Sequence, residues 1–150
     1  MKSPLPIFAL ALALLAPAGM RAEETAAAFP EGSELEGKME KMNGAFRKLR
    51  RQVADPAQNA ASLELVAKLR AATTQAAATL PDTIGKLSPE KQAAAKTSYM
   101  EKMKELLATI DELSAALKAD KNEEAVKIIE NLRLQEAAGH KEFRPKKKQD

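Results

Sequence analysis

The chain has 150 residues, with 24 Lys and Arg against 21 Asp and Glu, which gives a formal net charge of +3. It contains no Cys, and this excludes disulfides, thiolate metal sites and covalently attached c-type haem. The single His excludes a metal site built from two histidines of one chain. Aromatic residues make up only 3% of the chain, too few for a β-sandwich, whereas Ala, Leu, Glu, Lys and Gln favour helices. The composition therefore predicts a single all-α domain.

Residues 1–22 have the order of features that is typical of a secretory signal peptide. A positive start at Lys2 precedes an apolar run from Leu5 to Leu15, and small residues follow, with cleavage expected after Ala18 or Ala22. The run is shorter than the roughly 20 residues that span a bilayer, although a retained membrane anchor is the alternative. No later stretch is apolar enough to cross a membrane. We therefore expect an exported protein with no membrane insertion after signal cleavage.

The charge of the mature chain is nearly balanced. Without Lys2 and Arg21, 22 basic residues oppose 21 acidic ones, a net charge of +1 that gives no reason to expect a nucleic-acid partner. Basic residues do gather near the C-terminus, at Lys141, Arg144 and within the tail 145–150. This cluster is either a solvated chain end or a docking patch for an acidic partner.

The first helix is predicted to follow a flexible arm at residues 23–32. Ser33 and Glu36 form a capping box, which places the helix start at Ser33, and Asp55-Pro56 ends the helix. Steps of 4, 3, 4, 3 and 4 residues separate its apolar side chains, which is the spacing of one helix face. These side chains are Leu35, Met39, Met42, Phe46, Leu49 and Val53.

A second helix is predicted from about Ala57 to Ala78, and a loop follows it from Pro81 to Ser88. The apolar side of this helix is formed by Leu63, Val66, Leu69, Ala72, Ala76 and Leu80.

Two further helices are predicted from their start signals. Ser88 caps the third, with Pro89 at its first position, and Asp120 with Glu123 opens the fourth as an acidic capping box, before Pro145 ends it. The third helix has Tyr99, Met103, Leu106, Ile110, Leu113 and Leu117 on its apolar face. The fourth has Ala125, Ile128, Ile129, Leu132 and Phe143.

Four amphipathic helices joined by short loops pack most simply as an antiparallel up-down-up-down four-helix bundle. We expect this bundle to occupy residues 33–144 and to be a monomer. A coiled-coil oligomer is the competing interpretation, but Pro56 and Pro81 divide the pattern into bundle-sized pieces.

His140 is the unusual polar residue of the fourth helix. At 100° per residue it lies about 20° from Ile129 and about 60° from Ala125 around the helix, so it points toward the interior. A lone inward His is either a packed, hydrogen-bonded residue or a ligand.

Methionine gives a second indication of a ligand site. Met39 and Met42 are three residues apart on the first helix, and Met100 and Met103 are three apart on the third. Met also fills cores, so both interpretations stay open. As ligands, thioether and imidazole suit haem iron or copper(I). In the expected bundle, Met39 and His140 lie at the same end and can share a centre between the first and fourth helices.

The two ends of the bundle resemble the periplasmic cytochrome b562 family. Residues 35–43 resemble its opening helix and 132–144 its closing helix, while 68–72 resemble part of its second helix. Residues 110–132 match the third and fourth helices without a gap. The resemblance implies an electron-transfer protein with one non-covalent haem b per chain, axial ligands Met39 and His140, and transient contacts with redox partner proteins. It implies no enzymatic activity.

The resemblance also implies residues around the haem. Glu36, Met42, Asn43 and Phe46 correspond to positions that line the first-helix side. Tyr99 corresponds to a Phe over the haem, and Arg144 to an Arg near a propionate, where a guanidinium pairs well with a carboxylate. The sequence departs from the family at three positions. Met103 replaces a second pocket Phe, Glu136 brings a negative charge to the haem edge, and Gly139 loosens the helix before His140.

Two other functions compete with electron transfer. One is a copper(I)-binding protein that uses Met39, Met42, Met100, Met103 and His140, and the other is a haem-free bundle with an adaptor or chaperone-like role. An enzyme is not expected, because no paired carboxylates, nucleophile with a base, or phosphate loop can be identified.

Overall fold

The computed structural model describes residues 31–144, with side chains from Glu34 onward. The predicted signal peptide, most of the predicted arm and the tail 145–150 lie outside this range. The described part contains helices and no strand. Its elements are α1 (Glu31–Gln52), the 3₁₀ turn η1 (Pro56–Gln58), α2 (Asn59–Ala77), α3 (Asp82–Gly85), α4 (Pro89–Lys118) and α5 (Asn122–Phe143).

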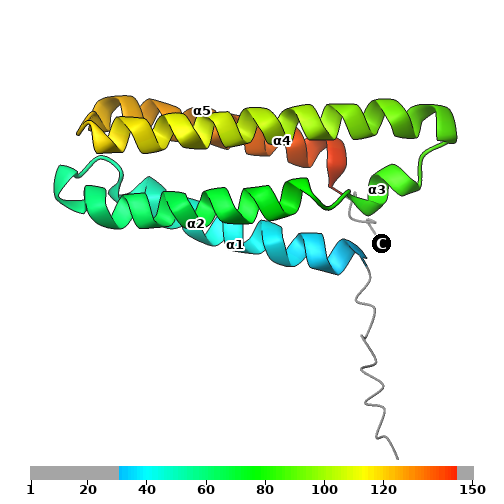
Figure 1. Cartoon of the computed structure of the whole chain (residues 1–150), viewed down its shortest axis with the longest axis horizontal. Coiled ribbons are helices and arrows are strands. Elements are labelled where there is room, and N and C mark those ends of the chain that lie inside the picture. Colours follow the sequence, from blue (N-terminus) through cyan, green and yellow to red (C-terminus); the bar gives the residue numbers. More distant parts are fainter. Residues whose placement is uncertain (1–30, 145–150) are drawn as a thin grey trace, which may run out of the picture.

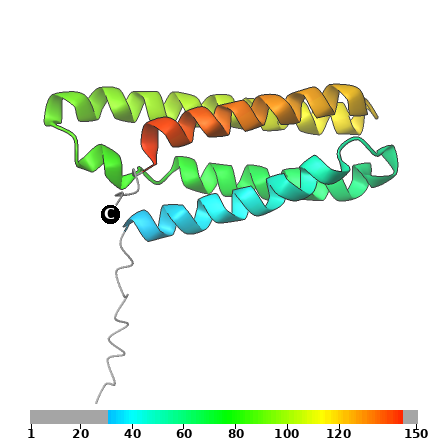
Figure 2. The ribbon, with the colours of Figure 1, turned by 180° about the vertical axis from the view of Figure 1, so that it is seen from behind.

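Four long helices pack side by side with alternating direction, and they form the predicted all-α four-helix bundle (Figure 1). α1 packs along α2, α2 along α4, and α4 along α5, whereas α1 and α5 touch at only a few positions. Figure 2 shows α1 and α5 on the same face of the bundle, with the beginning of α1 and the end of α5 at one end. We call the junction of these two helices the α1–α5 seam.

Two of the predicted helix starts are wrong. α1 begins at Glu31, so Ser33 lies inside the helix and is not its N-cap. At the other end of the chain, Lys121 is the N-cap residue of α5, while Asp120 lies in the preceding turn with a φ of 55°. The Asp120 carboxylate accepts a hydrogen bond from the Asn59 side chain at 2.8 Å, so the contact it makes is a tertiary one.

The remaining boundaries follow the sequence signals more closely. Asp55 caps η1, because its carboxylate accepts the Ala57 backbone N–H at 3.0 Å. Pro89 is at the start of α4 as predicted, and Ser88 is its N-cap residue but makes no side-chain capping bond. The predicted loop 81–88 contains the short helix α3. Leu80, predicted on the apolar side of the second helix, follows the end of α2 and is 38% exposed.

The core divides into two clusters along the bundle. The larger cluster is packed around fully buried Leu49, Ile110 and Leu113. The smaller one lies at the end where α1 begins and α5 finishes, and we call it the open-end cluster. Its buried members are Leu35, Ala76, Ile84, Tyr99, Met103 and Phe143.

A buried amide pair joins the helices at the opposite end. The Asn122 side chain donates to the Val53 carbonyl oxygen at 2.7 Å and to Asn59 Oδ1 at 2.8 Å. Asn59 donates in return to Asn122 Oδ1 at 3.2 Å. The pair therefore fixes the chain directly after α1, the start of α2 and the start of α5 to one another.

Candidate functional site

Met39 lies on the flank of α1 that is turned away from α2. The α2-facing flank is marked by Lys38, which donates to Thr79 at 2.8 Å, and by Gln52, which donates to Ser62 at 3.0 Å. Around the helix, Met39 is about 100° from Lys38 and about 140° from Gln52. Because α5 is the other neighbour of α1, the half-buried Met39 side chain faces the α1–α5 seam.

His140 lies on the corresponding flank of α5. Two hydrogen bonds mark the flank of α5 that faces α4. Gln135 donates to the Thr109 hydroxyl at 3.0 Å, and Glu142 accepts from the Ser98 hydroxyl at 2.7 Å. His140 is about 140° from Gln135 and about 160° from Glu142 around the helix. The half-buried imidazole is therefore turned away from α4 and toward the seam.

Charge interactions farther along the seam indicate the register of the two helices. A hydrogen bond from Arg133 lowers the pKa of the Glu130 carboxyl, and the charge of Arg50 on α1 lowers it further. Arg50 is therefore near Glu130. Met39 lies eleven residues before Arg50, and His140 ten residues after Glu130. In an antiparallel pair these steps are nearly equal in length, so Met39 and His140 lie toward the same end of the α1–α5 seam.

The open-end cluster forms an apolar wall beside Met39. Met39 and Met42 pack against it from α1. The rings of Tyr99 and Phe143 meet edge to face, with centroids 5.3 Å apart. Such aromatic contacts stabilise a core beyond the area that they bury.

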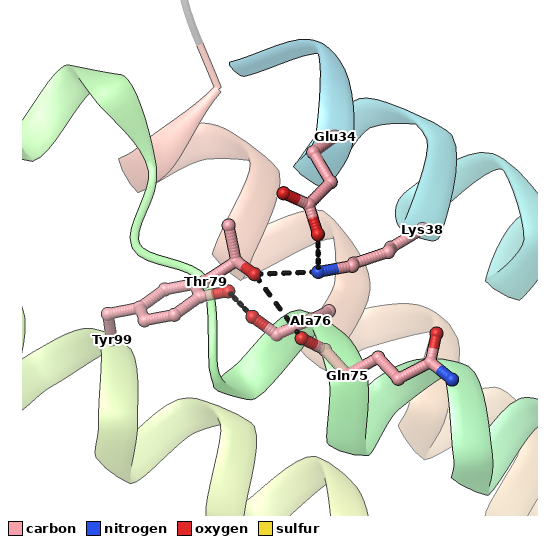
Figure 3. A network of polar contacts seen from close by, with 6 residues as sticks. All are labelled: Glu34, Lys38, Gln75, Ala76, Thr79 and Tyr99. Carbon is pink, nitrogen blue, oxygen red and sulfur yellow. Dashed lines mark hydrogen bonds and ion pairs between the residues drawn. The ribbon is translucent and has the colours of Figure 1, made fainter. Parts of the chain in front are cut away.

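Tyr99 is held by a hydrogen bond to the main chain of α2. Its hydroxyl donates to the Ala76 carbonyl oxygen at 2.8 Å (Figure 3). The nearby Thr79 hydroxyl donates to the Gln75 carbonyl oxygen and accepts a hydrogen bond from Lys38. Lys38 also forms an ion pair with Glu34. Burial raises the pKa of Tyr99 to about 12. The network thus joins α1, α2 and α4 at the open end of the bundle.

Tyr99→Phe is expected to reduce the free energy of unfolding by about 1 kcal/mol, because the Ala76 carbonyl loses its buried donor. The wild type should also lose stability as pH rises between about 10 and 12, since the phenol ionises first in the unfolded chain. Urea unfolding across this pH range checks both effects. Tyr99 is the only Tyr, so phenolate absorbance reports it alone. An identical pH profile in Tyr99→Phe would contradict the assigned burial.

The other predicted site residues are unevenly placed. Asn43 is half-buried and Met103 is buried in the open-end cluster, whereas Phe46 belongs to the larger cluster. Glu36 and Arg144 are exposed.

Met100 does not join the other methionines. Its side chain is 55% exposed, although the three-residue spacing from Met103 predicted a shared face. Met100 therefore does not belong to the predicted five-residue copper(I) site, because position 100 lies on the solvent side of α4.

Two features of the site were missed by the sequence reasoning. Phe143 was expected as a core residue only, but its ring lies against Tyr99 three residues after His140. Thr83 of α3 donates to the Phe143 carbonyl oxygen at 2.8 Å and so holds the end of α5. The inward position of Phe143 could have indicated the first contact, but no sequence signal indicated the second.

The donors that the seam offers are soft and neutral. No group of three or more His, Asp or Glu side chains that could hold a metal converges within residues 31–144. None of the helices described in this range is long and apolar enough to span a membrane. A thioether and an imidazole at one end of the bundle, with an apolar cluster beside the thioether, are donors that suit an iron that carries a flat macrocycle. The residues present therefore fit a haem, and the fold together with this donor chemistry indicates a haem-binding four-helix bundle.

Comparison with known proteins identifies the family. Residues 34–144 match the family model of cytochrome b562, and the chain belongs to this family. No curated protein matches the chain. The family consists of haem b-binding helical bundles that transfer electrons, and its members are soluble periplasmic proteins and not typically enzymes. The membership confirms the resemblance found in the sequence.

Proposed function

We propose that this protein transfers electrons in the periplasm through one non-covalent haem b, with Met39 and His140 as the axial ligands of the iron. The proposal is supported by the position of Met39 on the flank of α1 turned away from α2, and of His140 on the flank of α5 turned away from α4, at the same end of the bundle. The half-burial of both side chains supports it, because a ligand must be shielded from water and yet reachable.

The remaining residues of the site have supporting roles in this proposal. Haem supplies a one-electron carrier, and Met/His ligation raises its reduction potential. Tyr99, Met103 and Phe143 exclude water from the seam. Met39 and His140 would both hold the iron of the bound haem, which would favour electron transfer over oxygen chemistry.

Two charged side chains adjust the site. Glu136 is half-buried, one turn before His140 and about 40° from it around α5, so its carboxylate favours the more positive, oxidised state. Arg144 is exposed directly after α5, where its guanidinium can pair with a carboxylate at the rim of the site.

Export and partner choice belong to the same proposal. The signal-peptide pattern of residues 1–22 and the periplasmic location of the family support export through an N-terminal signal. Redox partner proteins would bind briefly, because electron-transfer encounters use small interfaces.

Met39→Ala tests the ligand set. Loss of the thioether should convert the iron toward the high-spin state, visible in the absorption spectrum of the haem-loaded protein. The matched control is Met100→Ala, because Met100 is exposed on α4. This control should keep the wild-type spectrum. A wild-type spectrum in Met39→Ala would show that Met39 is not the ligand.

Copper(I) is the second candidate ligand. Met39, Met42 and Met103 all contact the open-end cluster, and soft sulfur selects this ion. Folded protein that takes up copper(I) but no haem would favour this function over the first. Folded protein that takes up neither would favour the haem-free adaptor or chaperone-like role.

A further inference from the structure

The second half of α1 carries an unbalanced positive charge. Residues 41–54 include five basic side chains and no acidic one. Three of them, Arg47, Arg50 and Arg51, line a hollow in the surface and are exposed. We call these three residues the arginine face.

The guanidinium groups of the arginine face are largely free of acidic neighbours. Within residues 34–144, Arg47, Arg50 and Arg51 form no ion pair. Arg50 is near Glu130, but that carboxylate already accepts two hydrogen bonds from Arg133, at 2.6 and 2.8 Å. The positive charge of the face is therefore available to an external anion.

Helix stability explains only part of this arrangement. Arg50 and Arg51 lie in the last turn of α1, where cations interact favourably with the helix dipole. Arg47 lies before that turn, and lysine would serve the dipole equally well. Three guanidinium groups around one hollow instead match the planar, bidentate geometry of carboxylates.

The arginine face lies close to the proposed redox site. Along α1, Arg47 is about 12 Å and Arg50 about 17 Å from Met39, from the rise of a helix. Arg50 is on the same flank as Met39, about 20° from it around the helix, while Arg47 and Arg51 are about 80° and about 120° from it. A protein bound to this face would therefore lie along the α1–α5 seam that holds Met39 and His140.

We propose that the arginine face is the docking surface for a carboxylate-rich patch on a redox partner protein. This inference rests on the proposed electron-transfer function. A protein is favoured over an anionic membrane surface, because membrane-binding helices carry exposed apolar side chains beside the basic ones. The exposed large apolar side chains of the described chain are Leu80, Leu87, Met100, Val126 and Leu134, and none of them is on α1.

Binding of a hexaglutamate peptide to the haem-free protein, followed by backbone amide NMR at low salt, tests the surface independently of haem. The largest shift changes should fall on residues 47–51 and disappear at high salt. The triple variant Arg47→Gln, Arg50→Gln, Arg51→Gln should weaken binding by about tenfold. The control is Lys91→Gln, Lys96→Gln, Lys104→Gln, which removes the same charge from exposed positions of α4 and should bind like the wild type.

A second readout is the rate of electron transfer from the reduced, haem-loaded protein to hexacyanoferrate(III). The triple arginine variant should lower this rate, and the triple lysine variant of α4 should leave it unchanged. Peptide binding without haem uptake would overturn the proposed function and leave the arginine face as a carboxylate-binding surface without a redox partner. Equal weakening in both triple variants, or shift changes confined to the C-terminal basic residues, would overturn the docking surface. It would also be overturned if the protein bound phosphatidylglycerol vesicles but not the peptide.

Discussion

Haem affinity should fall by on the order of 100-fold, about 2.7 kcal/mol, when His140 is replaced by Ala. The imidazole is the stronger of the two proposed donors. No other His can take its place, since the chain has only one. Titration of the apoprotein with haem, followed in the Soret band, measures the loss. Added imidazole should restore part of the binding, because it can occupy the space that the side chain leaves.

Lys141→Ala is the control for this experiment. Lys141 is the next residue of α5 and is exposed, so its replacement should leave haem affinity unchanged. Circular dichroism should show the same helicity in both variants. If His140→Ala bound haem as tightly as Lys141→Ala, the imidazole would not be an axial ligand, and the α1–α5 seam would not be the haem site.

The second large effect is expected at the opposite end of the bundle. Asn122→Ala should reduce the free energy of unfolding by about 2–3 kcal/mol, because it leaves the Val53 carbonyl and the Asn59 amide without their buried partner. Urea unfolding of the haem-free protein measures the change. Asn131→Ala on the exposed side of α5 is the matched control and should change stability by less than about 0.5 kcal/mol.

Equal stability of the two Asn variants would contradict the buried amide pair. Haem affinity gives a further check, since Asn122 is far along α5 from His140. A folded Asn122→Ala protein should still bind haem, which separates the stability of the bundle from the chemistry of its open end.

The fold was predictable because apolar spacing dominates helix packing. Leu49 and Ile110 were both placed on inner faces by steps of three and four residues, and both are fully buried. Pro56 and Pro89 set their boundaries through local backbone geometry, which sequence alone determines. Signals of this kind do not depend on distant parts of the chain.

The capping predictions were less successful because side-chain oxygens have competing partners. Asp120 has the right spacing from Glu123 for a capping box, but its carboxylate binds Asn59, which is 61 residues away in the chain. Ser33 has the right spacing from Glu36, but α1 begins two residues earlier, at Glu31. Helix caps are worth only about 1 kcal/mol, so a single tertiary contact can override them.

The candidate site was predictable in part for the same reason. The inward direction of His140 and its shared end with Met39 follow from helix geometry. The contacts that shape the surroundings do not, because the Tyr99–Phe143 pair and the Thr83 hydrogen bond join residues far apart in the chain. The exposure of Met100 also required the structure, since a spacing of three residues does not tell which of two side chains faces the core.

The absorption spectrum of purified protein after addition of haem, removal of the excess and reduction with dithionite tests the central claim most directly. Sharp α and β bands, with one haem per chain, are expected for a six-coordinate b-type iron held by Met39 and His140. Folded, helical protein whose spectrum shows no bound haem would rule out the proposed haem site and leave only the four-helix bundle.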